Sequence, residues 1–104
     1  MARFDIYPNP IRADRDLFPY VLEIQSDLLY QFVERVCVPL ASGSTVPGMT
    51  DRFNPVIVVD DTQCRLHPLG ISVFLTSELR RSVGSAKPQA QDIDTALDML
   101  LRGY

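Results

Sequence analysis

The spacing of apolar residues changes once along this chain, from every second position to every third or fourth. Between residues 4 and 75 apolar side chains mostly alternate with polar ones, as at Tyr20, Leu22 and Ile24. This period is typical of half-buried strands, because successive side chains of a strand point to opposite faces. Over residues 93–101 the period becomes that of one helix face. The order predicts an α+β fold, an antiparallel sheet followed by one helix.

Turn-forming residues divide the alternating part into separate strands. We expect strands within residues 4–7, 20–28, 36–40, 55–59, 63–67 and 71–75. Residues 11–19 and 41–45 are expected to form loops, and Asp60-Asp61 a hairpin turn. Residues 55–59 are apolar at every position, which predicts a central strand covered on both faces. So many short consecutive strands favour a strongly bent antiparallel sheet or a small barrel.

The predicted C-terminal helix carries signals for both of its ends. Asp92 and Asp94 lie near its start, where negative charge complements the helix dipole. Arg102 falls in the last turn, where a positive charge is favourable. Gly103 follows, and glycine readily adopts the left-handed conformation that ends helices. We therefore expect the helix to end at residue 102.

Length and charge limit the classes of function. A chain of 104 residues with 46% hydrophobic residues has the size of a single domain, residues 1–104. Its net charge of -3 argues against a broad grip on a nucleic-acid backbone, although local basic patches remain possible. No stretch approaches the roughly 20 apolar residues that cross a bilayer, and residues 1–5 lack a secretory apolar segment. We expect a cytoplasmic protein without membrane contact.

The sequence offers no convincing catalytic or metal-binding set. His67 is the only histidine, and one imidazole cannot supply a typical zinc site. Cys37 and Cys64 lie in apolar runs without a CxxC partner, which predicts buried reduced thiols. The stretch 43–48 lacks the pattern of a phosphate-binding loop. We expect no cofactor, no metal and no catalytic residue, and hence a function in protein binding.

One enzymatic interpretation stays open. A ribonuclease can work without histidine or metal, because arginine and hydroxyl groups can share electrostatic stabilisation and proton transfer. Arg12, Arg15, Ser42 and Thr45 are the residues available for this chemistry. Arginines among aspartates in a loop are also typical of an ordinary solvated surface.

Several short runs, in their order and spacing, resemble the CcdB family of toxins over nearly the whole chain. They are Gln25-Ser26-Asp27, residues 38–42, residues 55–57 and the helix that ends at Gly103. The resemblance implies an SH3-like small barrel with a C-terminal α-helix, a fold that this family shares with the MazF ribonucleases. It also implies a homodimer that binds the A subunit of DNA gyrase and traps gyrase on cleaved DNA. Such a toxin is not an enzyme, and it reaches DNA only through gyrase or its antitoxin.

The same resemblance implies which residues face gyrase. They are Ser26, Leu28, Asp98, Leu101, Arg102, Gly103 and Tyr104. Gly103 matches the family pattern, whereas Arg102 stands where the family has tryptophan. Each residue also has a purely structural interpretation, such as a strand end for Ser26 or a helix cap for Gly103.

The family's antitoxin, CcdA, inhibits through a disordered acidic C-terminal segment that folds along the toxin. The resemblance implies a CcdA-like partner here, and Arg12 and Arg15 are the residues expected to contact it. Three hypotheses remain: a gyrase poison, a MazF-like endoribonuclease on the same fold, and a non-toxic relative that retains only antitoxin binding.

Overall fold

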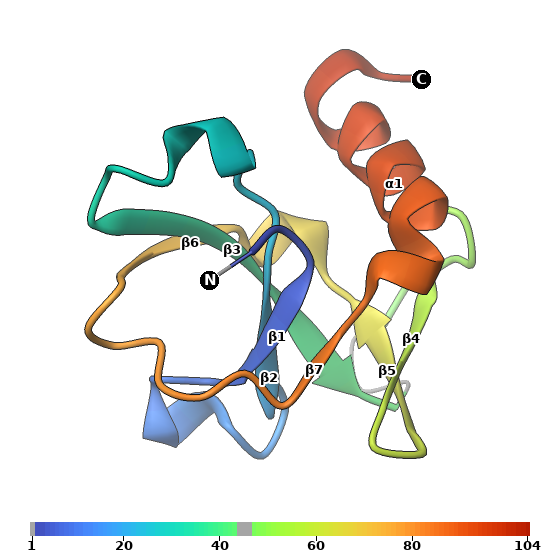
Figure 1. Ribbon diagram of the computed structural model, residues 1–104. Helices are drawn as coiled ribbons and strands as arrows, with labels where there is room; N and C mark the ends of the chain where they lie inside the picture. Colours follow the sequence, from blue (N-terminus) through green and yellow to red (C-terminus); the bar gives the residue numbers. More distant parts are fainter. Residues whose placement is uncertain (1, 44–46) are drawn as a thin grey trace.

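The strands form one antiparallel sheet in the computed structural model, which describes residues 2–43 and 47–104. The strands are β1 (Asp5–Pro8), β2 (Tyr20–Glu23), β3 (Glu34–Ser42), β4 (Val56–Val59), β5 (Thr62–Leu66), β6 (Ser72–Leu75) and β7 (Gly84–Ser85). Figure 1 shows that the sheet curls into a nearly closed barrel. The predicted α+β small barrel is confirmed.

The long strand β3 bends the sheet, because it changes its partner halfway along one edge. Its other edge pairs with β2, from Cys37 to Leu40. On the changing edge, Glu34–Cys37 pair with β6 and Leu40–Ser42 pair with β5. The resulting order is β4-β5-β3-β2-β1-β7, with β6 attached to β3.

The helix α1 (Ala90–Arg102) packs on the sheet through the apolar stripe that the sequence predicted. Ile93, Ala96 and Leu97 are buried in a core shared with β1 to β5. Gly103 follows with φ 82°, and its N–H donates to the Asp98 carbonyl at 3.1 Å. The predicted helix end is therefore confirmed, and the end of α1 projects beyond the sheet (Figure 1).

A second apolar cluster covers the opposite face of β1, β2 and β3. Its members are Tyr7, Val21, Cys37, Phe74 and Leu79. Cys37 lies in this cluster and Cys64 in the main core, and both are free and buried, as predicted. Burial raises the pKa of the Cys37 thiol to about 12.

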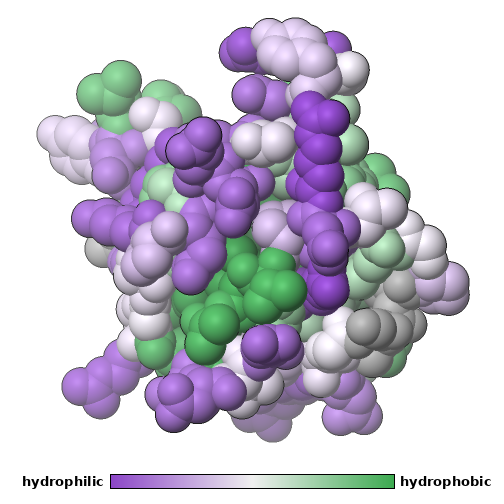
Figure 2. Space-filling view, turned by 90° about the vertical axis from the view of Figure 1, so that its right-hand side faces the viewer, coloured by the Kyte–Doolittle hydropathy of each residue, from purple (hydrophilic) through white to green (hydrophobic). Residues whose placement is uncertain are grey.

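Two predictions about strands were wrong. β4 is an edge strand rather than a central one, and its Val58 side chain is 47% exposed. Figure 2 looks onto the side of the molecule that carries α1, and shows an apolar patch bordered by hydrophilic side chains.

The second wrong prediction concerns the length of β2. This strand ends at Glu23 instead of reaching residue 28, because a 3₁₀ turn, η2 (Asp27–Leu29), follows. Ser26 caps this turn by accepting a hydrogen bond from the Leu28 N–H at 3.2 Å.

Short turns form several of the remaining connections. Asp60 and Asp61 both have positive φ, 52° and 64°, which confirms the predicted hairpin turn. The expected loop 11–19 contains the 3₁₀ turn η1 (Arg12–Asp14), and η3 (Pro68–Gly70) and η4 (Lys87–Gln89) follow β5 and β7. The predicted loop 41–45 begins only after β3 ends at Ser42, and Thr45 lies outside the described residues. Over the described part of the chain, no helix is long and apolar enough to span a bilayer.

Candidate protein-binding surfaces

The residues predicted to face gyrase lie on two segments, η2 with its cap and the end of α1. We call them together the tip surface: Ser26, Leu28, Asp98, Leu101, Arg102, Gly103 and Tyr104. Both segments lie at the same end of the molecule, at the top of Figure 1. The side chains of Leu28, Leu101 and Tyr104 are 85%, 72% and 64% exposed. Large apolar groups are thus presented to solvent at this end.

Arg3 connects η2 to the first half of α1. Its backbone N–H donates to Asp27 Oδ1 at 2.8 Å, and its Nη2 lies 2.9 Å from Asp94 Oδ1. Its Nε donates to the Ile24 carbonyl at 3.0 Å. One residue therefore holds η2 beside α1. Arg3 was not predicted from the sequence, because its partners are 21 to 91 positions away and no local pattern marks it.

The C-terminal residues contact one another. Arg102 Nε lies 3.9 Å from Asp98 Oδ1, one turn earlier on α1, and Arg102 Nη1 donates to the Tyr104 hydroxyl at 3.1 Å. All three side chains are at least partly exposed, so these contacts contribute little to stability. They leave the guanidinium and the tyrosine ring available to a partner.

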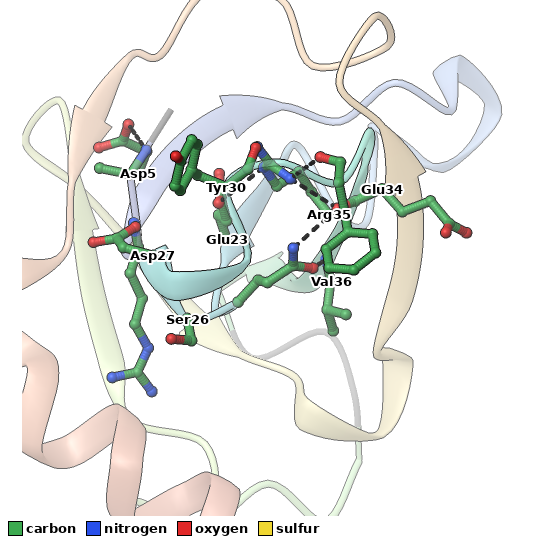
Figure 3. Close-up of polar contacts among 12 residues, drawn as sticks. Asp5, Glu23, Ser26, Asp27, Tyr30, Glu34, Arg35 and Val36 are labelled. Atoms are coloured by element: carbon green, nitrogen blue, oxygen red, sulfur yellow. Dashed lines mark hydrogen bonds and ion pairs between the residues drawn. The ribbon is translucent and has the colours of Figure 1, made fainter.

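A buried ion pair supports η2 from below (Figure 3). Arg35 is 6% exposed and donates hydrogen bonds to the carbonyls of Tyr30, Phe32 and Glu34. Its Nε lies 3.5 Å from Glu23 Oε2. Burial raises the pKa of Glu23, and this effect outweighs the opposing attraction of Arg35. Glu23 Oε1 has no hydrogen-bond partner in the described part of the chain.

An exposed apolar face adjoins η2 on the outer side of β3 and β6. We call it the apolar face: Leu29, Phe32, Val33, Val36, Val73 and Leu75. Val36 and Val73 are opposite each other in the β3–β6 pairing. Leu29, Phe32, Val36 and Val73 line a shallow cavity of about 200 Å³. Among the strands that the structure describes, β6 pairs with β3 alone, so its other edge borders this face.

The arginines predicted to contact an antitoxin lie far from the tip surface, around η1. Arg12 and Arg15 line a cavity of about 390 Å³ together with Arg80, Pro8, Pro10, Ser77 and Glu78. We call it the basic pocket. Arg15 Nε donates to the Asn9 carbonyl at 2.6 Å, which fixes one side. Within residues 2–43 and 47–104, none of the three guanidinium groups forms an ion pair with a carboxylate. Arg80 comes from another loop and was not predicted.

The structure does not assemble the ribonuclease set that the sequence left open. Ser42, at the end of β3, is not among the residues that line the basic pocket, and Thr45 lies outside the described residues. Ser77 is the hydroxyl side chain that lines the pocket with Arg12 and Arg15. Among the residues that the structure describes, no group of three or more His, Cys, Asp or Glu side chains is placed to hold a metal ion.

Comparisons with known proteins agree with this fold. A family model described as CcdB protein matches residues 3–103. A solved endoribonuclease from mycobacterial species is similar with a TM-score of 0.75 and 18% identity, over 97% of this chain and 90% of that one. An endoribonuclease in complex with its cognate antitoxin, also from mycobacterial species, gives 0.76 and 18%, over 97% and 94%. Comparison with curated proteins yields no match.

Proposed function

Because the chain belongs to the CcdB family, we propose that it is the cytoplasmic toxin of a toxin–antitoxin pair that binds the A subunit of DNA gyrase. The observation that carries this proposal is the tip surface. Ser26 and Leu28 come from one segment and residues 98–104 from another, yet both segments lie at one end of the molecule (Figure 1), and Arg3 ties the first of them to α1. These are the positions that the family resemblance assigns to gyrase.

The proposed mechanism needs no bond-breaking by the toxin itself. A ligand that binds one state of an enzyme better than another shifts the enzyme toward that state. A toxin that prefers gyrase with cleaved DNA therefore accumulates that complex. Exposed Leu28 and Leu101 supply apolar surface that a partner can bury, and Tyr104 is of a residue type that commonly dominates binding energy. Arg102 adds a planar fork of hydrogen-bond donors in place of the family's tryptophan.

We further propose that two copies associate through the apolar face. An exposed apolar patch next to a free strand edge favours association with another chain. A charged side chain in its centre, Val73→Glu, is expected to convert the dimer into a monomer in analytical ultracentrifugation. A wild-type protein that sediments as a monomer at micromolar concentration would rule out the homodimer.

The basic pocket is the proposed contact for a CcdA-like antitoxin with a disordered acidic segment. Its arginines form no ion pair with a carboxylate within the described residues, although Glu78 also lines the pocket, so they can bind carboxylates of another chain. A solved structure of similar fold was obtained in complex with its cognate antitoxin. DNA contact, in this proposal, arises only through gyrase or the antitoxin.

Gyrase assays test the central proposal directly. Purified protein is mixed with gyrase, supercoiled DNA and ATP, and linear DNA is measured after detergent treatment, with binding to the gyrase A subunit measured separately. We expect binding and an increase in cleaved DNA. If binding occurs without cleavage and without growth arrest in a sensitive host, the protein is a non-toxic relative, and Arg102→Trp is expected to restore cleavage. Loss of both binding and cleavage would rule out the gyrase function.

A second candidate function is RNA cleavage. The similar solved structures are endoribonucleases, and the basic pocket combines three arginines with the Ser77 hydroxyl. Incubation with a long RNA in the presence of EDTA tests it. Cleavage that disappears in Arg12→Gln and Ser77→Ala would establish this function, and intact RNA at high protein concentration would exclude it.

A further inference from the structure

A second cavity lies beside the basic pocket, on another face of η1. Arg12 and Arg15 line the basic pocket, whereas Ile11 and Asp14 line the second cavity. The two members of each pair are three positions apart along the chain. Because a 3₁₀ helix has three residues per turn, the members of a pair lie on the same face of η1, and the two pairs lie on different faces. The 3₁₀ turn is thus a ridge between two cavities.

This second cavity, which we call the aromatic pocket, has a volume of about 170 Å³. The rings of Phe18 and His67 stack in its wall, with centroids 5.3 Å apart and an interplanar angle of 22°. Val21 and Phe74, members of the second apolar cluster, also line it. Burial lowers the pKa of His67, which keeps its ring predominantly neutral near pH 7.

The loop between the two pockets is fixed by a buried amide. Asn9 is 3% exposed; its Nδ2 donates to the Phe18 carbonyl at 2.8 Å, and its Oδ1 accepts from the Ile11 N–H at 2.9 Å. These bonds tie both ends of the loop to one side chain. Because a preformed site loses less entropy on binding, both pockets are suited to recognition.

We propose that the two pockets together bind one acidic peptide segment, whose carboxylates contact the basic pocket and whose aromatic side chain enters the aromatic pocket. This inference rests on the proposed antitoxin binding and adds a requirement for an aromatic residue. The volume fits, because an apolar protein cavity of about 150 Å³ holds a benzene ring. The Phe18 and His67 rings contribute aromatic surface to the lining, with which such a ring can pack.

Charge favours a peptide over RNA as the occupant. The chain carries a net charge of -3, and Asp14 and Glu78 line the two pockets. RNA brings a phosphate with every nucleotide, whereas a peptide can place neutral residues beside Asp14 and carboxylates beside the arginines. Only the short turn η1 separates the two pockets. An extended peptide crossing it can contact both, because its successive side chains point in opposite directions.

Labelled peptides test the inference on the full-length protein. The probes are twelve-residue peptides rich in Glu, each with a single Phe at a different position, and one matched peptide with Ala instead. Fluorescence anisotropy measures their binding. Burial of the ring is expected to make the best Phe peptide bind roughly tenfold to a hundredfold more tightly than the Ala peptide. Arg12→Gln is expected to weaken both.

A filled pocket provides the decisive control. Ser72 is exposed and lines the aromatic pocket, so Ser72→Trp is expected to abolish the preference for Phe while leaving the Ala peptide unaffected. Thr62→Trp, at the exposed first residue of β5, is the matched control and is expected to change neither. Equal binding of Phe and Ala peptides would overturn this inference alone, and absence of all peptide binding would overturn antitoxin recognition as well. A short oligoribonucleotide would be the occupant if it displaced the labelled peptides, and if excess Phe peptide did not displace the oligoribonucleotide in turn. That result would assign the pockets to RNA.

Discussion

The tip surface and the basic pocket lie at opposite ends of the molecule and are built in different ways (Figure 1). The η2 segment of the tip surface depends on contacts between distant parts of the chain, since Arg3 reaches Asp27 and Asp94 across 24 and 91 positions. The loop of the basic pocket is held by Asn9 and Arg15, whose bonds span nine and six positions. A substitution that destabilises the core should therefore disturb the structure of the tip surface more than that of the basic pocket.

The two ends also differ in polarity. The tip surface presents aliphatic and aromatic groups above a buried ion pair, whereas the basic pocket presents guanidinium groups to solvent. Binding at the tip surface should therefore depend on shape and apolar burial, and binding at the basic pocket on salt. The two surfaces can be disabled separately.

The largest expected effect comes from removing the support of the tip surface. Arg35→Met should destabilise the protein by about 3–5 kcal/mol, because it leaves the Glu23 carboxylate buried without its partner. The folded-state pKa of Glu23 is already raised by burial, and Arg35 is the main influence that lowers it. The loss of stability in Arg35→Met should therefore be full at pH 7, where Glu23 is charged in the unfolded chain, and smaller at pH 4, where Glu23 is largely protonated. Urea denaturation at both pH values measures this.

The matched control removes both members of the pair. Glu23→Gln combined with Arg35→Met should be more stable at pH 7 than Arg35→Met alone, because no buried charge remains. An equal loss of stability at pH 7 and pH 4 would contradict the role given to Glu23.

The next effect concerns the apolar contact at the tip surface. Leu101→Ala should weaken binding to the gyrase A subunit by about 30-fold, the effect of losing a strong interface anchor of about 2 kcal/mol. Leu101 is exposed, so stability should not change. Gln91→Ala, exposed at the other end of α1, is the control and should bind as the unmodified protein does. Surface plasmon resonance with the immobilised gyrase A subunit measures both.

A smaller effect is expected at the basic pocket. Arg80→Gln should weaken acidic peptides about threefold to fivefold at low salt, in line with exposed ion pairs, and less at high salt. Arg52→Gln, at an exposed arginine outside the pocket, should leave peptide binding unchanged. Neither variant should alter gyrase binding. A loss of gyrase binding in Arg80→Gln would show that the two ends are not independent.

The smallest effect on stability is expected at the junction between η2 and α1. Arg3→Met should cost under about 1 kcal/mol, because the ion pair with Asp94 is partly solvated. Its effect should instead be local, with faster amide exchange at Leu29, whose N–H bonds to the Ser26 carbonyl within η2. Unchanged exchange in η2 would mean that the Arg3 side chain does not help to hold η2, and that the bond from the Arg3 backbone N–H to Asp27, which this variant retains, is sufficient.

Local patterns predicted most of the fold but little of what joins its parts. The change of period located α1, and the Asp60-Asp61 pair located a hairpin turn. Alternation does not show which strands become neighbours, so the apolar run of β4 was wrongly placed in the centre of the sheet. It also did not show that Ser26 begins a new turn by capping it.

In the candidate site, too, residues close together in the sequence could be predicted, whereas residues that act through distant partners could not. Arg12 and Arg15 were found because they lie close together in one loop, and the structure places them in one pocket. Arg80, Arg3 and the Glu23–Arg35 pair were missed, because each acts through a partner far away along the chain. A single sequence holds no signal for such pairs.

The exchange of partners along β3 has a consequence for how the chain acquires its structure. One edge of β3 is completed only by β5 and β6, which follow it, and β1 finds its second neighbour in β7, close to the C-terminal helix. Proteins dominated by such non-local pairings fold more slowly than helical ones of the same size. During synthesis the growing polypeptide must therefore keep strand edges uncovered until nearly all of it has left the ribosome, and this interval is when self-association is most dangerous to it.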